Sequence, residues 1–402
     1  MRILALGDLH LGAGASFGAP GERLRDQVAV LHRIVDLALG EQVDALLLAG
    51  DIFHRPHPDP PTLLTFDRPI ARLRAAGIPA LAIVGNLGHD QSGADRECAL
   101  DVFRHAIDVH RKPGIWEIGD VRVATLPSVP VHRLVASRNG GDRDALNAEA
   151  AELLLDTARG LRADIADKHT AILLAHWSVS GAVTPTGADV GVFREPVLPL
   201  AELEAIGFDA VVLGHIHRGQ LLSPGPLSVD GNGSHVVKDR RPIFYTGSAA
   251  VVDWSEGDTP HGCWILDTEG PSLSFHEIED RPFLTWDVDF LDGDDFSMIL
   301  EGYEPLVSQA RGAVVRLRYQ ATEEQARRID EAAVRGALDV AGAHRVFLQP
   351  SIVREARARV EGADETLTPL EALHMWCEHQ EIEAAMRDEM GARTATYLET
   401  LA

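Results

Sequence analysis

The chain reads Ile3-Leu4-Ala5-Leu6-Gly7-Asp8-Leu9-His10 near its start, an apolar run that ends in two side chains able to bind metal. A continuous apolar run of this length, bounded by glycine, predicts a strand that is buried on both faces. Asp8 and His10 alternate along the end of that strand. They therefore project to the same side and can serve one ion.

The same arrangement recurs at four later places in the chain. Apolar runs of strand length end in Gly50-Asp51, Gly85-Asn86, Ala175-His176 and Gly214-His215-Ile216-His217. Open α/β sheets hold their sites outside the carboxyl ends of the strands, so these side chains can meet in one crevice. The sequence predicts an α/β fold whose metal ligands are Asp8, His10, Asp51, Asn86, His176, His215 and His217.

The residue types suit a centre of two divalent ions. Such ions lie about 3.5–4 Å apart and need a shared carboxylate. Asp51 is the predicted bridge, because the lone pairs of its two oxygens face different ways. Mixed imidazole and carboxylate ligands suit Mn, Fe or Zn better than Mg or Ca, and we expect Mn. The alternative is that none of these side chains binds metal. A lone histidine is more often merely hydrogen-bonded, and Asp8 or Asp51 could cap a helix. For all seven residues, that alternative requires seven coincidences.

These motifs resemble those of the calcineurin-like metallophosphoesterases. The resemblance extends to the DNA double-strand-break repair nucleases of the SbcD type, which work with the SMC-like ATPase SbcC. It rests on Asp8-Leu9-His10-Leu11-Gly12, Gly50-Asp51-Ile52-Phe53-His54, Gly214-His215-Ile216-His217-Arg218 and Tyr245-Thr246-Gly247-Ser248. It implies a four-layer, two-sheet metallophosphoesterase sandwich flanked by helices, and two Mn ions bound by the seven residues.

One loop departs from the pattern of that family, which reads Gly-Asn-His-Asp. This chain reads Gly85-Asn86-Leu87-Gly88-His89-Asp90, two residues longer. The family's histidine helps the leaving group depart, and the resemblance gives this catalytic role to His89, since Gly88 permits unusual backbone angles. The alternative is that His89 swings away and activity is weakened. Asp90 either orients the His89 ring or is a solvated loop charge.

Three further side chains near these motifs have two interpretations each. His54 and His57 either contact the ligand side chains from behind or touch the substrate, or they are ordinary loop histidines. Arg218 either holds a phosphate through its planar fork or forms a surface salt bridge.

Length and composition limit the classes of protein to which this chain can belong. A chain of 402 residues predicts two or three domains. No apolar run approaches the ~20 residues that span a bilayer, and a strand starts at once, so we expect neither a membrane segment nor a removable signal. Cys98, Cys263 and Cys377 show no disulfide framework or zinc motif. A cytoplasmic protein with reduced thiols is expected.

The net charge of −24 is unusual for a protein that holds DNA, because such proteins neutralise phosphates with basic side chains. Local basic clusters occur at Arg104–Lys112 and Lys238–Arg241. Acidity therefore favours weak binding of DNA by the chain alone and a partner that supplies affinity. It also keeps a phosphodiesterase of small molecules as an alternative.

Periodicity predicts the organisation of the first domain, residues 1–280. Apolar stripes predict helices at 25–39, 62–76 and 144–166. Residues 223–241, rich in Gly, Ser and Pro, form either a flexible coil or a substrate-facing loop. Strands at 243–246, 262–267 and 273–278 follow with little helix between them. We expect these strands to build the second sheet of the sandwich.

Two further regions follow a boundary near Asp280-Arg281-Pro282. Residues 281–349 predict a small α+β cap domain, with strands at 284–290, 313–319 and 345–348 and helices at 294–310 and 322–341. The resemblance implies that this cap guides DNA; the alternative is a packing domain without a ligand. Residues 350–402 comprise a linker (350–365) and a C-terminal helical segment.

The C-terminal segment starts with Thr368-Pro369-Leu370-Glu371, a capping box with proline at the first helical position. Leu370, Leu373, Trp376 and Cys377 make an apolar face, and residues 381–401 predict a second helix. The resemblance implies that these helices bind the base of the ATPase coiled coil. The alternative is that they fold back on the cap domain.

The sequence thus predicts a Mn-dependent DNA exonuclease and endonuclease of double-strand-break repair and recombination. By the resemblance it works with an SbcC-like SMC-type ATPase, as a homodimer within a heterotetramer. One alternative is a calcineurin-like phosphodiesterase of small phosphodiesters, which needs neither cap nor C-terminal helices. The other is a non-catalytic scaffold subunit, which only the altered spacing before His89 favours.

Overall fold

The computed structural model describes residues 1–14, 17–19, 21–92, 98–135, 142–192, 195–222, 228–229, 235–238, 241–269, 272–289, 308–353 and 367–401. The chain divides into two compact units. The first comprises Met1–Trp286, Leu300–Leu317 and Ala332–Leu348, and the second comprises Asp287–Ile299, Arg318–Glu331 and Gln349–Ala402. The predicted division into 1–280, 281–349 and 350–402 stays a prediction.

Two large sheets form the core of the first unit. The eight-stranded sheet has the order β12-β13-β16-β15-β1-β2-β3-β4. Its strands are β1 (Arg2–Leu6), β2 (Ala45–Leu48), β3 (Ala80–Ile83), β4 (Asp108–His110), β12 (Ser228–Val229), β13 (His235–Lys238), β15 (Gly262–Asp267) and β16 (Ser272–Glu277). Strands β1 to β4 run parallel, and β15 pairs antiparallel with β1.

The six-stranded sheet has the order β11-β14-β10-β7-β6-β5. Its strands are β5 (Gly114–Ile118), β6 (Val121–Leu126), β7 (Thr170–His176), β10 (Ala210–Gly214), β11 (Gln220–Leu221) and β14 (Ile243–Tyr245). Strands β6, β7, β10 and β14 are parallel. A two-stranded pair of β8 (Ser178–Val179) and β9 (Val197–Leu198) follows β7 in the chain.

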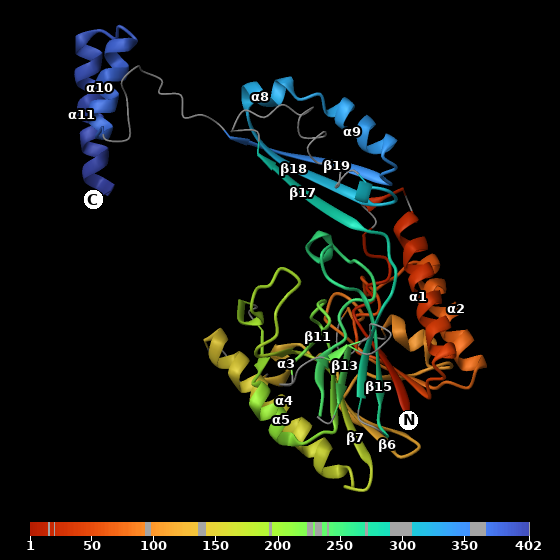
Figure 1. Ribbon diagram of the computed structural model, residues 1–402. Helices are drawn as coiled ribbons and strands as arrows, with labels where there is room; N and C mark the ends of the chain where they lie inside the picture. Colours follow the sequence, from red (N-terminus) through yellow and green to blue (C-terminus); the bar gives the residue numbers. More distant parts are fainter. Residues whose placement is uncertain are drawn as a thin grey trace. The chain divides into compact units, whose positions relative to one another are not determined.

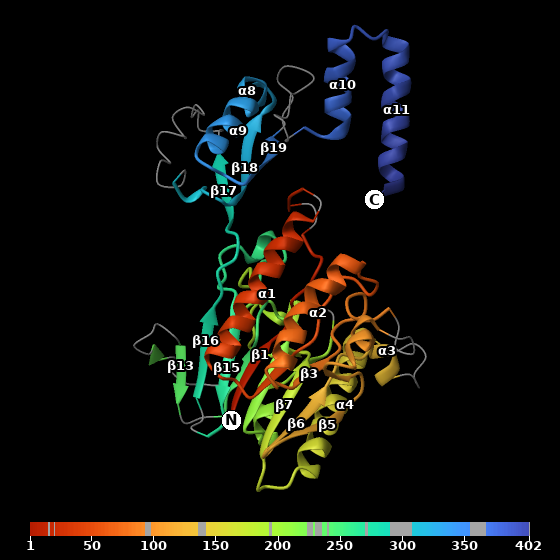
Figure 2. The same cartoon turned by 90° about the vertical axis from the view of Figure 1, so that its right-hand side faces the viewer.

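Helices cover the outer faces of both sheets, which gives four layers (Figure 1). On the eight-stranded sheet lie α1 (Glu22–Gly40) and α2 (Pro60–Ala75), which stand side by side in Figure 2. On the six-stranded sheet lie α4 (Arg143–Asp164) and α5 (Leu200–Ile206). The predicted α/β sandwich is confirmed, and the three helices expected at 25–39, 62–76 and 144–166 correspond to α1, α2 and α4.

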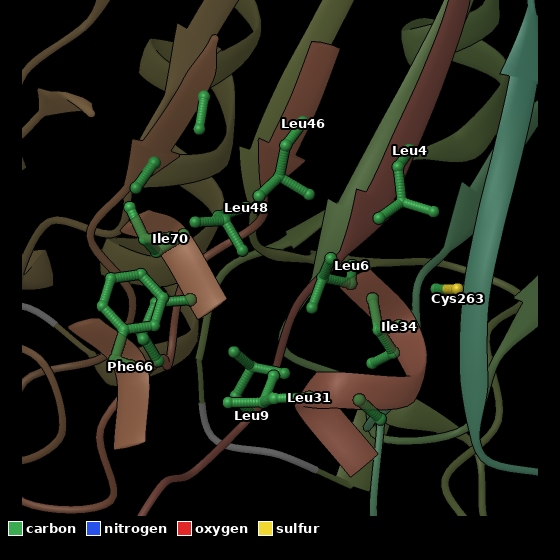
Figure 3. Packing of buried hydrophobic residues seen from close by; sticks show 14 of the residues in the cluster. Leu4, Leu6, Leu9, Leu31, Ile34, Leu46, Leu48, Phe66, Ile70 and Cys263 are labelled. Atoms are coloured by element: carbon green, nitrogen blue, oxygen red, sulfur yellow. The ribbon is translucent and has the colours of Figure 1, made fainter. Parts of the chain in front are cut away.

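Three apolar clusters hold these layers together. Between the sheets pack residues such as Ile3, Leu47 and Ile172, none of them exposed. Leu4 and Leu48 point the other way, toward Ile34 of α1 and Phe66 of α2 (Figure 3). Strands β1 and β2 are therefore buried on both faces, which is why their sequences are continuously apolar rather than alternating.

The expectation that residues 243–278 build one sheet was wrong. β14 pairs with β10 in the six-stranded sheet, whereas β15 and β16 join β1 in the eight-stranded one. The chain therefore crosses from one sheet to the other between Tyr245 and Gly262. β14 and β15 are both short and mainly apolar, and nothing local in their sequences distinguishes the two sheets.

A third sheet has the order β17-β18-β19, with strands β17 (Phe283–Asp289), β18 (Val314–Thr322) and β19 (Arg345–Val353). The helix expected at 322–341 is two helices, α8 (Glu323–Arg328) and α9 (Glu331–Val340), because the chain is extended at Ile329. β19 continues five residues beyond the predicted end at 348. Most of the helix expected at 294–310 and most of the linker lie outside the described residues.

The C-terminal segment forms two helices, α10 (Pro369–His379) and α11 (Ala384–Leu401), which pack against each other (Figures 1 and 2). The predicted capping box is present: Thr368 accepts from the backbone N–H of Glu371, whose carboxylate accepts from the N–H of Thr368. Cys377 is buried, and Leu370, Leu373 and Trp376 are half-buried. Among the described helices, none is long and apolar enough to cross a bilayer.

Candidate metal centre

The seven predicted ligands come from the carboxyl ends of five strands. Asp8 and His10 follow β1, Asp51 follows β2 and Asn86 follows β3, all at one edge of the eight-stranded sheet. His176 ends β7, and His215 and His217 follow the neighbouring parallel strand β10 of the other sheet. The two sheets bring these edges together, and the seven side chains form one cluster.

The backbone is strained at four of the seven predicted ligand residues. Asp8, His10, Asp51 and His215 have φ values of +48°, +41°, +50° and +95°. Left-handed conformations of this kind are unfavourable for residues other than glycine and concentrate at functional sites. Two glycines let the strand ends approach: a Cβ on Gly50 would lie 2.9 Å from the Cα of Gly85, and one on Gly85 would overlap the Asp51 carboxylate.

Asp51 lies at the centre of the cluster. Its Oδ2 is 3.4 Å from His176 Nε2, 3.7 Å from His10 Nε2 and 3.3 Å from Asn86 Nδ2. Its Oδ1 accepts a hydrogen bond of 2.6 Å from the backbone N–H of Asn86. The two oxygens of this buried carboxylate thus face different neighbours, as a bridging ligand requires.

Two overlapping triads have ligand atoms close enough to hold an ion. Asp8, His10 and His217 form one, and Asp8, Asp51 and His176 form the other; within each, the ligand atoms lie within 4.8 Å of one another. In the first triad the Nε2 atoms of His10 and His217 are 3.0 Å apart. Because the triads share Asp8, two ions held by them would be neighbours.

His215 and Asn86 complete the cluster. His215 Nδ1 lies 2.8 Å from Asn86 Nδ2, and the backbone N–H of His215 donates to both oxygens of Asp8, at 2.9 and 3.0 Å. A half-turn of the Asn86 amide would bring its oxygen, the atom that binds metals, to the position of Nδ2.

In three of the ligand histidines, one ring nitrogen lies within hydrogen-bond distance of an oxygen atom. His176 Nδ1 lies 2.6 Å from the carbonyl oxygen of Ala49, His215 Nε2 lies 2.6 Å from Glu195 Oε1, and His217 Nδ1 lies 2.7 Å from Glu256 Oε1. The opposite nitrogen of each ring is left to face the cluster, as in metal sites generally. Sequence reasoning missed Glu195 and Glu256, because both lie in loops without a motif or periodicity.

The donor set fits divalent metal ions. Within the described part of the chain, His176 Nε2 is buried and has no hydrogen-bond partner, although it points at Asp51. An orphaned buried nitrogen is costly unless something such as a metal ion satisfies it. Imidazole and carboxylate donors together are the ligand types of Mn, Fe and Zn.

Electrostatics of the metal-free cluster agree with this assignment. Burial lowers the pKa of His10 well below its ordinary value, which leaves a neutral ring. Burial also opposes charge on His176 and His217, but Asp51 and Glu256 respectively raise the pKa of each ring to about 9. Burial would raise the pKa of Asp51, yet the positive charge and the hydrogen bond of His176 lower it overall. Metal ligation would displace the histidine protons.

His89 lies beside the cluster despite its longer loop. Its ring centroid is 4.6 Å from that of His10 and 5.6 Å from that of His54, and its Nδ1 lies 2.9 Å from the carbonyl oxygen of His54. His10, His54 and His89 form a third group with potential ligand atoms within 4.8 Å. By contrast, His57 is exposed and Arg218 is half-buried.

Asp90 has neither of its predicted roles. It is fully buried, and its oxygens accept hydrogen bonds of 2.9 Å from the backbone N–H groups of Phe53 and Gly85. It therefore ties together the loops after β2 and β3, which carry Asp51 and Asn86. Burial and the charge of Asp51 raise the pKa of Asp90 to about 7.

A two-sheet α/β sandwich whose strand ends converge on a cluster of Asp, His and Asn defines the class of metal-dependent phosphoesterases. Residues 1–219 match the calcineurin-like phosphoesterase family, and the chain belongs to that family.

Two curated relatives carry more specific names. The chain is 31% identical over 299 residues to a DNA double-strand break repair protein Mre11 from Haloferax volcanii, covering 73% of this chain and 56% of that protein. It is 27% identical over 318 residues to the SbcD subunit of the nuclease SbcCD from Rhodobacter capsulatus, covering 70% of each chain. The chain thus spans little more than half of the Haloferax protein.

Solved structures show more distant likenesses. A dimetal phosphatase from Danio rerio is 11% identical, with a TM-score of 0.38, over 66% of this chain and 91% of that one. The TT1561 protein of Thermus thermophilus is 13% identical, with a TM-score of 0.37, over 69% of this chain and 99% of that one.

Proposed function

We propose that the chain is a DNA nuclease that uses two divalent ions, Mn expected, to hydrolyse phosphodiester bonds. The observation that carries the proposal is the convergence of seven ligand side chains, five of which form two triads that share Asp8. When bound, the two ions supply Lewis-acid stabilisation of charge on the phosphate. The names of the relatives, a double-strand break repair protein and a nuclease subunit, support DNA as the substrate.

The chain's own residues divide the work in this proposal. Seven side chains would hold the ions, with Asp51 as the shared carboxylate: those of Asp8, His10, Asp51, Asn86, His176, His215 and His217. His89, whose ring lies beside that of His10, donates a proton to the departing sugar oxygen. Both exonuclease and endonuclease activity are proposed, in double-strand-break repair and recombination.

The proposal includes a partner ATPase of the SMC type, with the chain acting as a homodimer within a heterotetramer. The net charge of −24 supports a partner that supplies affinity for DNA. Both arginines of one basic cluster pair with a neighbouring carboxylate: Arg104 Nε lies 2.8 Å and Arg111 Nη1 3.1 Å from Asp101. In the other, only Arg241 has a described side chain, 4.0 Å from Asp209.

Incubation of the purified protein with linear duplex DNA and Mn²⁺, with and without a chelator, tests the function. We expect cleavage that the chelator stops. Asp51→Asn and His215→Ala should abolish it while the fold persists, since each removes a ligand but little buried apolar area. Asp164→Asn and His105→Ala change exposed residues of the same types and serve as matched controls.

Three outcomes separate the alternatives. Full cleavage by Asp51→Asn or His215→Ala in the presence of Mn²⁺ contradicts the metal assignment. Hydrolysis of a small test phosphodiester without cleavage of DNA identifies a phosphodiesterase of small substrates. Binding of two equivalents of metal with no hydrolysis of either substrate identifies a scaffold subunit.

A further inference from the structure

One of the predicted ligands, His217, contacts a buried carboxylate that is not itself a predicted ligand. Glu256 is fully buried, and its Oε1 lies 2.7 Å from His217 Nδ1. Its Oε2 accepts hydrogen bonds from the hydroxyl of Ser248, at 2.8 Å, and from the backbone N–H of Val252, at 3.1 Å. Both oxygens are therefore engaged, and the carboxylate has no freedom to turn.

The contact sets the state of the His217 ring. A carboxylate accepts, so the ring nitrogen that faces Glu256 carries the proton. Nε2 is then the nitrogen left to give up its proton and bind an ion, and it faces the cluster 3.0 Å from His10 Nε2. The backbone of His217 is held as well, because its carbonyl oxygen accepts from the N–H of Ser248 at 2.9 Å.

The short turn that carries Glu256 is itself anchored. It spans Trp254–Glu256, and the Asp253 side chain caps it by accepting from the N–H of Ser255. The Trp254 ring lies 5.4 Å from the rings of Phe17 and Phe283 and 5.7 Å from that of Phe347, centroid to centroid. The guanidinium carbon of Arg316 lies 4.5 Å from its centroid.

These contacts connect two parts of the first unit. Phe283, Arg316 and Phe347 belong to the strands of the three-stranded sheet, β17, β18 and β19. Trp254 rests among them, and Glu256 follows two residues later in the same turn. A displacement of the turn would therefore move the carboxylate that orients His217.

We propose that Glu256 is a positioning residue of the metal centre, which holds the His217 ring with Nε2 toward the ions, and that the Trp254–Glu256 turn fastens it there. This inference rests on the proposed two-metal function and deepens it. Partners of metal-bound histidines that lie behind the ligand typically change metal affinity by about 10- to 100-fold when mutated. Glu256 is expected to act within that range.

The test is a calorimetric Mn²⁺ titration of the full chain as wild type, Glu256→Ala, Glu256→Gln and, as a control in the same turn, Ser255→Ala. Ser255 is exposed and contacts only the Asp253 carboxylate through its side chain. We expect a loss of affinity of about 10- to 100-fold for Glu256→Ala. Glu256→Gln should lose less, because its amide oxygen can still accept from Nδ1. Ser255→Ala should bind as wild type does.

A second readout does not depend on catalysis. In metal-free protein labelled with ¹⁵N-histidine, NMR should show a hydrogen-bonded proton on His217 Nδ1 in the wild type and in Glu256→Gln. A folded Glu256→Ala protein with wild-type affinity overturns the proposal. If the alanine variant does not fold, Glu256→Gln decides: a proton moved to Nε2 without loss of affinity overturns the proposal, and a retained Nδ1 proton supports it.

The titration also separates this inference from the proposed function. If the wild type binds no metal, the two-metal nuclease is wrong. If the wild type binds two equivalents and Glu256→Ala binds them equally well, only the role of Glu256 is wrong.

Discussion

His89 reaches the metal cluster because the two additional residues of its loop bulge outward. Leu87 and Gly88 are exposed, and Gly88 has a φ of +100°, which allows the chain to reverse. Two backbone bonds close the bulge, from the N–H of His89 to Asn86 and from the N–H of Gly88 to Gln91. The loop therefore lengthens without carrying His89 away from His10.

His89→Ala should keep two bound metals but lose most of its turnover. His89 is not assigned as a ligand, and a general acid typically contributes about 10²- to 10⁴-fold. Single-turnover cleavage and a metal titration measure the two effects, with the exposed His57→Ala as the control. Loss of metal occupancy would make His89 a ligand, since it groups with His10 and His54. An unchanged rate would mean that His89 takes no part.

Asp90→Ala should destabilise the fold by about 2–6 kcal/mol. The change leaves the buried N–H groups of Phe53 and Gly85 without an acceptor, at about 1–3 kcal/mol each. Urea unfolding measures the loss, and Asp90→Asn, which keeps one acceptor oxygen, should lose less. A free energy of unfolding equal to that of wild type would show that other groups satisfy both donors.

At the scale of elements, the first helix is tied to a distant segment by a buried ion pair. Arg23 of α1 donates from Nη2 to Asp280 Oδ2 at 2.6 Å and to the carbonyl oxygen of Val251 at 2.7 Å. Both charged side chains are almost fully buried. The pair joins α1 to the segment before β17 and to the chain that leads to the Trp254–Glu256 turn.

Asp280→Asn should destabilise the protein by about 3 kcal/mol, because it removes the 2.6 Å partner of a buried charge and leaves Arg23 only the longer, 3.4 Å contact with Asp26. The matched control is Asp287→Asn, which breaks an exposed pair with Arg318 and should cost about 1 kcal/mol or less. Urea unfolding of both variants at pH 7 decides it. Equal losses would mean that burial of the Arg23 pair has no energetic consequence.

The same pair gives a pH dependence. Burial alone would raise the pKa of Asp280, but the hydrogen bond and charge of Arg23 lower it overall. A carboxylate with a depressed folded pKa stabilises the fold above its unfolded value, near pH 4, and loses that contribution as the pH falls through the folded value. The stability difference between wild type and Asp280→Asn should therefore shrink below about pH 4. A difference that stays constant to pH 3 would contradict this.

At the scale of the whole molecule, the proposed catalytic and partner-binding parts are separate in the sequence. All seven predicted ligands lie before residue 218, and the C-terminal helices begin at Pro369. Leu370, Leu373 and Trp376 are less exposed than the sequence suggested, because α10 and α11 pack together. Met386 and Tyr397 of α11 are instead 57% and 64% exposed.

Truncation after about residue 365 should leave cleavage of small test phosphodiesters at the full-length rate and abolish association with a coiled-coil ATPase. Co-purification of the two proteins with the ATPase measures the association. Met386→Glu in the full chain offers a milder version, which should weaken association and leave cleavage unchanged. If the truncated protein still binds its partner as tightly, the terminal helices are not the docking site.

The sequence alone determined the strand ends and the side chains that follow them. A buried strand in a parallel sheet must be continuously apolar, and side chains placed just beyond its carboxyl end share an edge with those of its neighbours. Both properties are local, so Asp8, His10, Asp51, Asn86, His176, His215 and His217 could be selected together from the sequence.

Only the tertiary structure decided which sheet each later strand joins and which side chains stand behind the ligands. β14 and β15 are both short and mainly apolar, and only their pairing, with β10 and with β1 respectively, separates them. Glu195 and Glu256 lie 20 and 39 residues from the histidines that they contact, in loops without periodicity. Contacts of that kind depend on how the chain closes over long distances, which no local pattern of residues encodes.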